Sequence, residues 1–416
     1  ESPSSIAYDW WTSFDSAELN AMMAQALENN TDLRAGLQRI AQARASLKIA
    51  GASLLPSINV SAGASRSKSN PASGKNTYAT SLSTGVSASY ELDLFGANRA
   101  DLVAAEAGYQ GSLYDQEALK LSLMGDVATG YFTLMNLHER LAIADNNLSN
   151  AREVLRIITA RVREGAESDI ELAQQKSTVA SNEASRSSLV EQIKNAENAL
   201  AVLLGQAPQS LSVTRQSLDT VRVPEIAAGQ PSELLERRPD LLSAEAGLRD
   251  ANADIGAARA AFYPSVSLGL SDSLSLAGFG DPSATVLSLA ASIATPIFSG
   301  GALDGGLEQA TAKQLELVET YRGSVLTAFQ EVEDALAAVK AAQERETALQ
   351  TAMTQSRRAY ALSKKRYDAG SIDYQTLLDT QNAQLSAEDS YAQATLARLT
   401  AAINLYRTLG GGWNSY

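Results

Sequence analysis

Cysteine is absent from the 416-residue chain, and histidine occurs only once. The chain can therefore form no disulfide, thiolate metal site or cysteine nucleophile, and one histidine leaves little room for histidine-based metal or triad chemistry. Basic residues are outnumbered, with 34 Lys and Arg against 47 Asp and Glu and a formal net charge of −13. Because phosphate neutralisation needs a basic excess, this balance argues against a nucleic-acid partner. We assign no catalytic, cofactor-binding or metal-binding residue.

Proline and aromatic residues are also scarce, at 10 residues and 6% of the chain, and the richness in Ala, Leu, Ser and Gln is typical of long helices. Apolar residues at three- and four-residue spacing predict a coiled-coil helix over 97–163. At 1.5 Å per residue, about 67 residues make a rod of roughly 100 Å, longer than an ordinary globular core needs. Shorter helices are expected over 19–54, 169–204 and 373–409.

The chain aligns with itself at a shift of about 205 residues, which places Asp32 over Asp240 and Gly165 over Gly370. We predict two structural repeats, 1–205 and 231–416, joined by a linker over 206–230 near the middle of the helical body. Each repeat is expected to contain a helix, two strands, a long helix and a further helix.

Alternating apolar and small polar residues predict the strands, at 57–65, 82–94, 265–271 and 286–298. Val86, Leu92, Leu289 and Ile293 lie on the apolar faces. Strands of about ten residues can cross a hydrocarbon layer at a tilt, but four strands cannot close a transmembrane barrel. Such a chain must oligomerise, because open sheet edges are not tolerated in lipid. A soluble sheet packed on one face would show the same alternation, although the long small-polar second face favours a pore lining.

Four segments match motifs of a known family: Tyr90 to Gly96, Arg238 to Asp240, Gly256 to Ser265, and Leu409 to Trp413. Through them essentially the whole chain resembles the outer-membrane efflux proteins of the TolC family, OprM-like branch. The resemblance implies a mainly α-helical protein with a membrane β-barrel. Three chains, with four strands each, would form a 12-stranded β-barrel continued by a long coiled-coil α-helical barrel.

The implied function is the passive exit duct of a tripartite multidrug efflux pump, in the outer membrane and extending into the periplasm. The duct would export drugs or other small toxic compounds from a Gram-negative bacterium, without catalytic activity. The implied partners are a homotrimer, a periplasmic adaptor (membrane fusion) protein, an inner-membrane efflux transporter and outer-membrane lipid. Two alternatives remain. One is a duct for type I protein secretion, and the other is a soluble coiled-coil scaffold, which would leave the strands without a purpose.

Charged residues crowd the turns at Gly165 and Gly370, where paired helices join far from the strands. Many of them fit simple helix caps. By resemblance, Tyr367 and Glu171 match positions that tie neighbouring helices together in the closed state, and we expect Tyr367 to hold the helices through Glu171. Asp379 matches an acidic ring at the constriction. Threefold symmetry would bring three such carboxylates together, attracting cations and repelling anions. The predicted gate residues are Asp379, Tyr367, Glu171, Gln375 and Asp373, with Gln375 replacing a leucine that often helps to plug the aperture.

Small and apolar residues at the same turns are the predicted docking tips for the adaptor. Grooves between the helix pairs continue the three- and four-residue seams and offer sites for adaptor helices. The residues are Gly165, Ala166, Ile170, Gly370 and Ile372.

Overall fold

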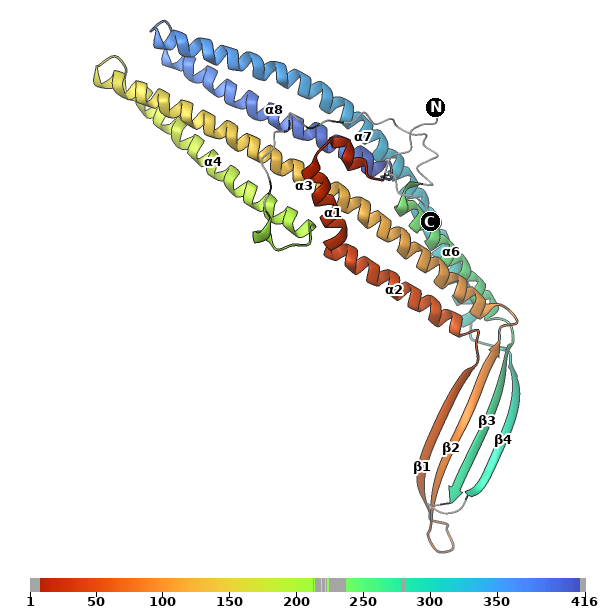
Figure 1. Ribbon diagram of the computed structural model, residues 1–416. Helices are drawn as coiled ribbons and strands as arrows, with labels where there is room; N and C mark the ends of the chain where they lie inside the picture. The colour runs from red at the N-terminus through yellow and green to blue at the C-terminus, as the bar shows by residue number, and fades with distance from the viewer. Residues whose placement is uncertain are drawn as a thin grey trace. The chain divides into compact units, whose positions relative to one another are not determined.

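The computed structural model describes residues 8–211, 213, 218, 221, 223, 237–277 and 282–411 (Figure 1). Most of the predicted linker over 206–230 and the closing Trp413 lie outside the described residues. The chain divides into two compact units. We name them the helical unit (Glu1–Gly36, Gln116–Pro239 and Val325–Tyr416) and the sheet unit (Leu37–Asp115 and Asp240–Ser324).

The longest elements are two helices of 67 residues each, α3 (Ala97–Arg163) and α7 (Ala302–Asp368). Two further helices, α4 (Asp169–Leu203) and α8 (Tyr374–Thr408), have 35 residues each, and α6 (Pro239–Ala260) has 22. Helix α3 spans the residues that the hydrophobic spacing predicts. Within the described ranges, no helix is both long and apolar enough to cross a bilayer.

The single helix expected over 19–54 is instead two helices, α1 (Ala17–Asn29) and α2 (Thr31–Ala52). They are separated by Asn30, whose Oδ1 accepts the backbone N–H groups of Asp32 at 2.9 Å and Leu33 at 3.1 Å. Asparagine favours such a cap because its side chain competes with the helical backbone bonds. The prediction of one helix was therefore wrong at this residue.

The helical unit has an apolar core to which α1, α3, α4 and α8 contribute. Trp10 is 2% exposed and stacks on Tyr406, with ring centroids 4.9 Å apart. Phe14 and Phe132 are completely buried beside them. This aromatic packing joins the N-terminal segment to helices from both halves of the sequence.

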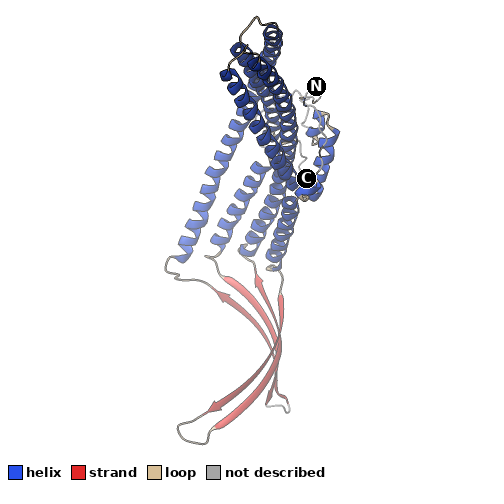
Figure 2. Cartoon of the chain, turned by 90° about the vertical axis from the view of Figure 1, so that its left-hand side faces the viewer, coloured by secondary structure: helices blue, strands red, loops and turns tan. Residues whose placement is uncertain are grey.

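The sheet unit contains four antiparallel strands in the order β1-β2-β3-β4, labelled in Figure 1 and drawn in red in Figure 2. They are β1 (Ser57–Ser69), β2 (Thr77–Leu92), β3 (Ser265–Ala277) and β4 (Pro282–Ala294). The register aligns Val60, Val86, Asp272 and Leu287 across the sheet. Because side chains alternate between faces, this register collects most large apolar residues on one face and most serines on the other.

The strands differ from the predicted ranges at both ends of the sheet. Beyond Ser65 the apolar residues stop, but pairing continues to Ser69↔Thr77, so β1 and β2 are longer there than their hydrophobic pattern suggests. At the other end, β2 stops at Leu92 because the next carboxylate, Asp93, accepts backbone N–H groups at the start of α3. Similarly, β4 ends at Ala294, before Pro296, which has no N–H to donate to a ladder.

A close approach inside the helical unit gives a stability prediction. Gly36 of α2 lies against the buried Gln116 of α3, whose Nε2 donates to the Leu33 carbonyl at 3.2 Å, and a Cβ at Gly36 would overlap Gln116 Oε1. We expect Gly36→Ala to displace this amide at a cost of about 1–3 kcal/mol, offset in part by the better helix propensity of alanine, up to about 1 kcal/mol. Denaturant unfolding measures the difference. Gly108→Ala is the control, because no described atom beyond its chain neighbours and its own helix backbone lies within 4 Å of its Cβ position. An equal loss in both variants would contradict the packing argument.

Candidate functional site at the helix tips

Two glycines turn the chain between the paired helices, at the free ends of α3/α4 and α7/α8 (Figure 1). Gly165 and Gly370 have φ values of 76° and 70°, in the left-handed region that favours glycine. The turns use the same backbone bonds: Ala166 N–H to the Arg161 carbonyl and Ser371 N–H to the Arg366 carbonyl, both at 2.9 Å. This pairing is the Schellman ending of a helix. It presents equivalent short loops at the two tips.

The residues after each turn cap the following helix, as their sequence predicts. Ser168 forms a capping box with Glu171, whose carboxylate accepts the Ser168 backbone N–H at 2.7 Å and its hydroxyl. Asp373 accepts the Thr376 N–H at 2.8 Å. These hydrogen bonds lower the pKa of Glu171 and of Asp373, the first through Ser168 and the second through Thr376. Two predicted gate residues are thus engaged within their own helices.

Tyr367 ties α7 to the α3/α4 turn, but its partner is not Glu171 as predicted. Its hydroxyl donates to Glu167 Oε1 at 3.0 Å. Arg161 completes the link: Nη1 lies 3.3 Å from the same carboxylate, Nη2 donates to the Tyr367 carbonyl at 3.1 Å, and the guanidinium carbon stands 4.4 Å from the ring centroid. The prediction failed because Glu171 is held by its own capping box, whereas Glu167 lies in the turn itself.

A second link, which the sequence analysis missed, joins α8 to α4 and α3. The Tyr374 hydroxyl donates to Gln175 Oε1 at 2.7 Å, and Gln175 Nε2 donates to the Ala151 carbonyl at 2.7 Å. Gln175 is completely buried, so both ends of its amide depend on these partners. A polar residue on an otherwise apolar helix face was the available signal.

The two tyrosines that form these links belong to an apolar cluster at the tip. In this cluster Tyr360, Tyr367 and Tyr374 pack with Val154, Ile158 and Leu377. Burial, followed by the bond to Glu167, raises the pKa of Tyr367 to about 12. Burial and the charge of Glu171 raise the pKa of Tyr374 to about 12. Both phenols are therefore protonated donors at neutral pH.

The remaining predicted residues separate into exposed and packed positions. Asp379 and Gln375 are exposed on α8, and Gln375 Nε2 donates to Asp379 Oδ1 at 2.8 Å. Ala166 is exposed and Ile170 is 70% exposed. Ile372, also predicted as a docking residue, is half-buried because it packs against the tyrosine cluster. Ile170 is thus a large apolar side chain that the tip presents to solvent.

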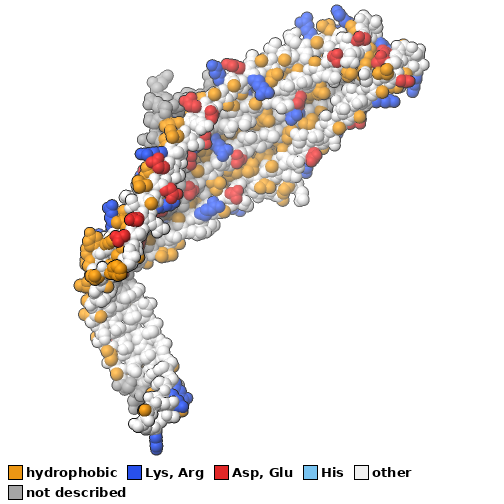
Figure 3. All heavy atoms as spheres, turned by 180° about the vertical axis from the view of Figure 1, so that it is seen from behind, with side chains coloured by type: hydrophobic (Ala, Val, Ile, Leu, Met, Phe, Trp, Pro, Cys, Tyr) orange, Lys and Arg blue, Asp and Glu red, His pale blue; other side chains and the backbone are white. Residues whose placement is uncertain are grey.

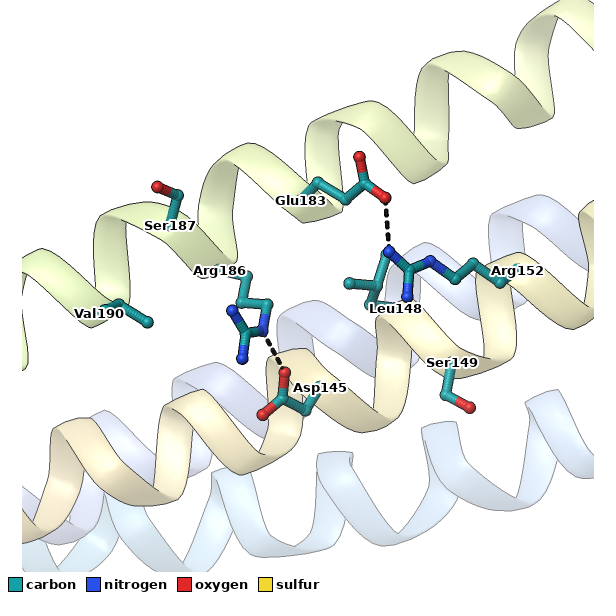
Figure 4. A pocket seen from close by; sticks show the side chains of 8 residues that line it. All are labelled: Asp145, Leu148, Ser149, Arg152, Glu183, Arg186, Ser187 and Val190. Carbon is teal, nitrogen blue, oxygen red and sulfur yellow. Dashed lines mark hydrogen bonds and ion pairs between the residues drawn. The ribbon is translucent and has the colours of Figure 1, made fainter.

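A groove of about 620 Å³ lies between α3 and α4 (Figure 4). Two ion pairs bridge it, Arg186 to Asp145 at 2.5 Å and Arg152 to Glu183 at 2.7 Å, while Leu148 and Val190 supply apolar lining. All four charged side chains are partly exposed, so each pair stabilises the helix pair by at most about 1 kcal/mol. Across the described ranges, no three His, Asp or Glu side chains are placed to hold a metal ion.

Comparison with known proteins gives matches over nearly the whole chain. The family described as outer membrane efflux protein matches residues 22–206 and 230–411. The pyoverdine export outer membrane protein OpmQ of Pseudomonas aeruginosa is 39% identical, over 98% of this chain and 88% of that protein. The cation efflux system protein CusC of Escherichia coli is 31% identical, over 97% and 88%. The crystal structure of the Campylobacter jejuni CmeC outer membrane channel has a TM-score of 0.91 at 28% identity, covering 99% of this chain and 90% of that chain.

Proposed function

This chain belongs to the outer membrane efflux protein family, and from that premise we propose that it is the passive exit duct of a tripartite efflux pump. It lies in the outer membrane and extends into the periplasm. Relatives named for pyoverdine export and for cation efflux support small solutes as the cargo. A family of channels has no need of a catalytic centre. Family membership also removes the alternative of a soluble scaffold.

The observation that carries the proposal is the open four-stranded sheet. Among the described residues, β1 and β4 each pair on one side only. Val60, Leu287 and Leu289 are more than 70% exposed on one face. Neither feature suits an isolated chain, since unpaired edges and apolar faces favour association. Three copies would pair all edges in a 12-stranded barrel, turn the apolar face toward lipid and leave the serine face around an aqueous lumen.

Separating the small-solute duct from a type I secretion duct requires a cargo assay. The chain is expressed in a strain lacking its own outer-membrane ducts, together with its neighbouring adaptor and transporter genes. We expect lower accumulation of a fluorescent pump substrate and a trimer that requires detergent for extraction. Secretion of a protein substrate without any change in dye accumulation would support the type I alternative instead.

The helix tips form the proposed gate. The Tyr367–Glu167 and Tyr374–Gln175 links hold the α7/α8 hairpin against the α3/α4 hairpin in the resting state. The exposed Asp379 of each chain contributes to a ring of three carboxylates at the aperture, with Gln375 beside it. Because like charges repel, closure depends on the tyrosine links and on packing. Partner binding opens the gate by favouring the arrangement without these links.

The exposed tip residues are the proposed docking surface for the periplasmic adaptor. We expect Ile170→Asp to abolish export while leaving the trimer intact, because a carboxylate in an apolar contact stays desolvated and unpaired. Drug susceptibility in the duct-deficient strain measures the loss. Val202→Asp, on the same helix and 61% exposed, is the matched control. Retained resistance in the Ile170 variant, or equal loss in both, would contradict docking at the tip.

A further inference from the structure

From Ser57 to Tyr90 the β1–β2 hairpin carries positive charge alone, in a chain whose net charge is −13. Arg66, Lys68 and Lys75 are the charged residues between Ser57 and Tyr90, and this segment contains no Asp or Glu. All three are exposed, the first two on β1 and the third in the loop that follows. Figure 3 shows Lys and Arg side chains gathered at this end of the sheet. Within this described segment, an anionic ligand would meet no acidic side chain.

The strand register places two of these cations on the apolar face. Arg66 and Lys68 alternate in phase with Val60, which is 76% exposed. Tyr78, 61% exposed, is the register partner of Lys68, so it lies on the same face. The Arg66 guanidinium carbon and Lys68 Nζ each lie 5.7 Å from the centroid of the Tyr78 ring. In the proposed barrel this face meets lipid, so the site would face lipid and not the lumen.

Two tyrosines on the apolar face indicate the depth of this cation site in the membrane. Tyr78 and Tyr90 are twelve residues apart on β2, which is roughly 40 Å along a strand and about 28 Å across a bilayer at the usual tilt. This matches the thickness of the apolar band of such barrels, and tyrosine is enriched at its two borders. Tyr90 is near the helix end of the sheet, on the periplasmic side. Tyr78 and its two cations consequently lie at the headgroup level of the outer leaflet.

We propose that Arg66, Lys68 and Lys75 bind the phosphate groups of a phosphorylated glycolipid of the outer leaflet, the lipid A portion of lipopolysaccharide. This inference rests on the proposed function, since it requires the strands to cross the outer membrane. Guanidinium and ammonium groups provide charge-assisted hydrogen bonds to phosphate oxygens. The exposed ring of Tyr78 supplies an amphipathic surface beside them. In the trimer the site occurs three times around the barrel.

The test measures lipid binding to the purified trimer by native mass spectrometry, with bisphosphorylated lipid A as the probe. We expect the variant Arg66→Gln/Lys68→Gln/Lys75→Gln to bind about 100-fold more weakly, since each of the three cations near an anionic lipid surface contributes about fivefold. The control, Arg39→Gln/Arg44→Gln/Lys48→Gln, removes the same charge from exposed positions of α2 for which the described part of the chain shows no ion pair. It is expected to bind as the wild type does.

Further arms identify the source of the phosphate and separate this inference from the proposed function. Wild-type binding should weaken with salt and with dephosphorylated lipid A. Equal binding of phosphatidylglycerol, competition by millimolar inorganic phosphate, or equal affinity of the hairpin variant and the control would each overturn the glycolipid site. Conductance in a planar bilayer is recorded in parallel. A wild type that forms no channel would refute the duct itself, whereas normal conductance without lipid A binding would refute this inference alone.

Discussion

Replacing Tyr367 and Tyr374 together by phenylalanine is expected to raise the conductance of the isolated trimer in a planar bilayer. The two substitutions remove two hydroxyls and keep both rings in the tip cluster, so they test the hydrogen bonds without creating a cavity. The bond to the Glu167 carboxylate contributes about 1.5–3 kcal/mol, and leaving the buried Gln175 oxygen without a donor costs about 1–3 kcal/mol. If both bonds exist only in the closed state, their loss shifts the closed-to-open ratio by about 100-fold or more.

Glu171→Gln is the matched control for the proposed gate. The carboxylate of Glu171 contacts Ser168 in its own capping box, so its replacement affects the start of α4 and leaves both tyrosine links in place. We expect unchanged conductance in this variant. If conductance rises in Glu171→Gln and stays unchanged in the double phenylalanine variant, then Glu171 holds the tip and not the two tyrosine links. That result would support the link between Tyr367 and Glu171 that the sequence predicts.

The pH dependence of the wild type provides an independent check. Burial raises the pKa of both tyrosines from the ordinary 10.0 to about 12. A raised pKa for an acid means that the packed tip retains protons that a loosened tip would release. The two protonated tyrosines therefore stabilise the packed tip fully below pH 10, and this stabilisation disappears as the pH rises toward 12. Conductance should increase over that interval in the wild type, and it should increase less in the double variant, which retains only Tyr360 of the three clustered tyrosines.

Much of the architecture follows from patterns that repeat over many residues. The apolar spacing in 97–163 delimits α3, and the alternation of β1 to β4 identifies a sheet with two unlike faces. In both cases one physical requirement, burial of a stripe or of a face, is repeated at every turn or second residue. The outcome is insensitive to any single position.

Single side-chain choices were harder to predict. Asn30 divides a helix by capping its continuation, and Glu167 takes the tyrosine that we assigned to Glu171. In each case two neighbouring groups compete for one hydrogen bond, and the winner depends on distances that sequence spacing does not determine. The bond between Tyr374 and Gln175 joins residues 199 positions apart. No local pattern contains such a pair, so that part of the site required the structure.

Arginine substitutions on the two faces of β1 are expected to differ strongly in their effect on the stability of the proposed barrel. Val60 lies on the apolar face and is 76% exposed, while the adjacent Ser61 lies on the serine face. In the proposed barrel, Val60→Arg would place a charge against the acyl chains near the bilayer midplane at a cost of about 2–4 kcal/mol. Ser61→Arg would point into the aqueous lumen and should cost little.

Val60 is a better test position than its register partner Val86, because Val86 is also aligned with Asp272. An arginine at Val86 would gain an opposite charge directly across the strands, which reduces the apparent cost of burying it in lipid. Guanidinium titration of the folded barrel in lipid vesicles measures the free energy of unfolding. A soluble sheet packed on its apolar face would also be destabilised by Val60→Arg. The decisive comparison is therefore whether the wild type folds in lipid vesicles and in buffer that contains neither lipid nor detergent. If the wild type stays folded without any amphiphile, or if both arginines are tolerated equally in lipid, then β1 does not line a membrane-spanning barrel.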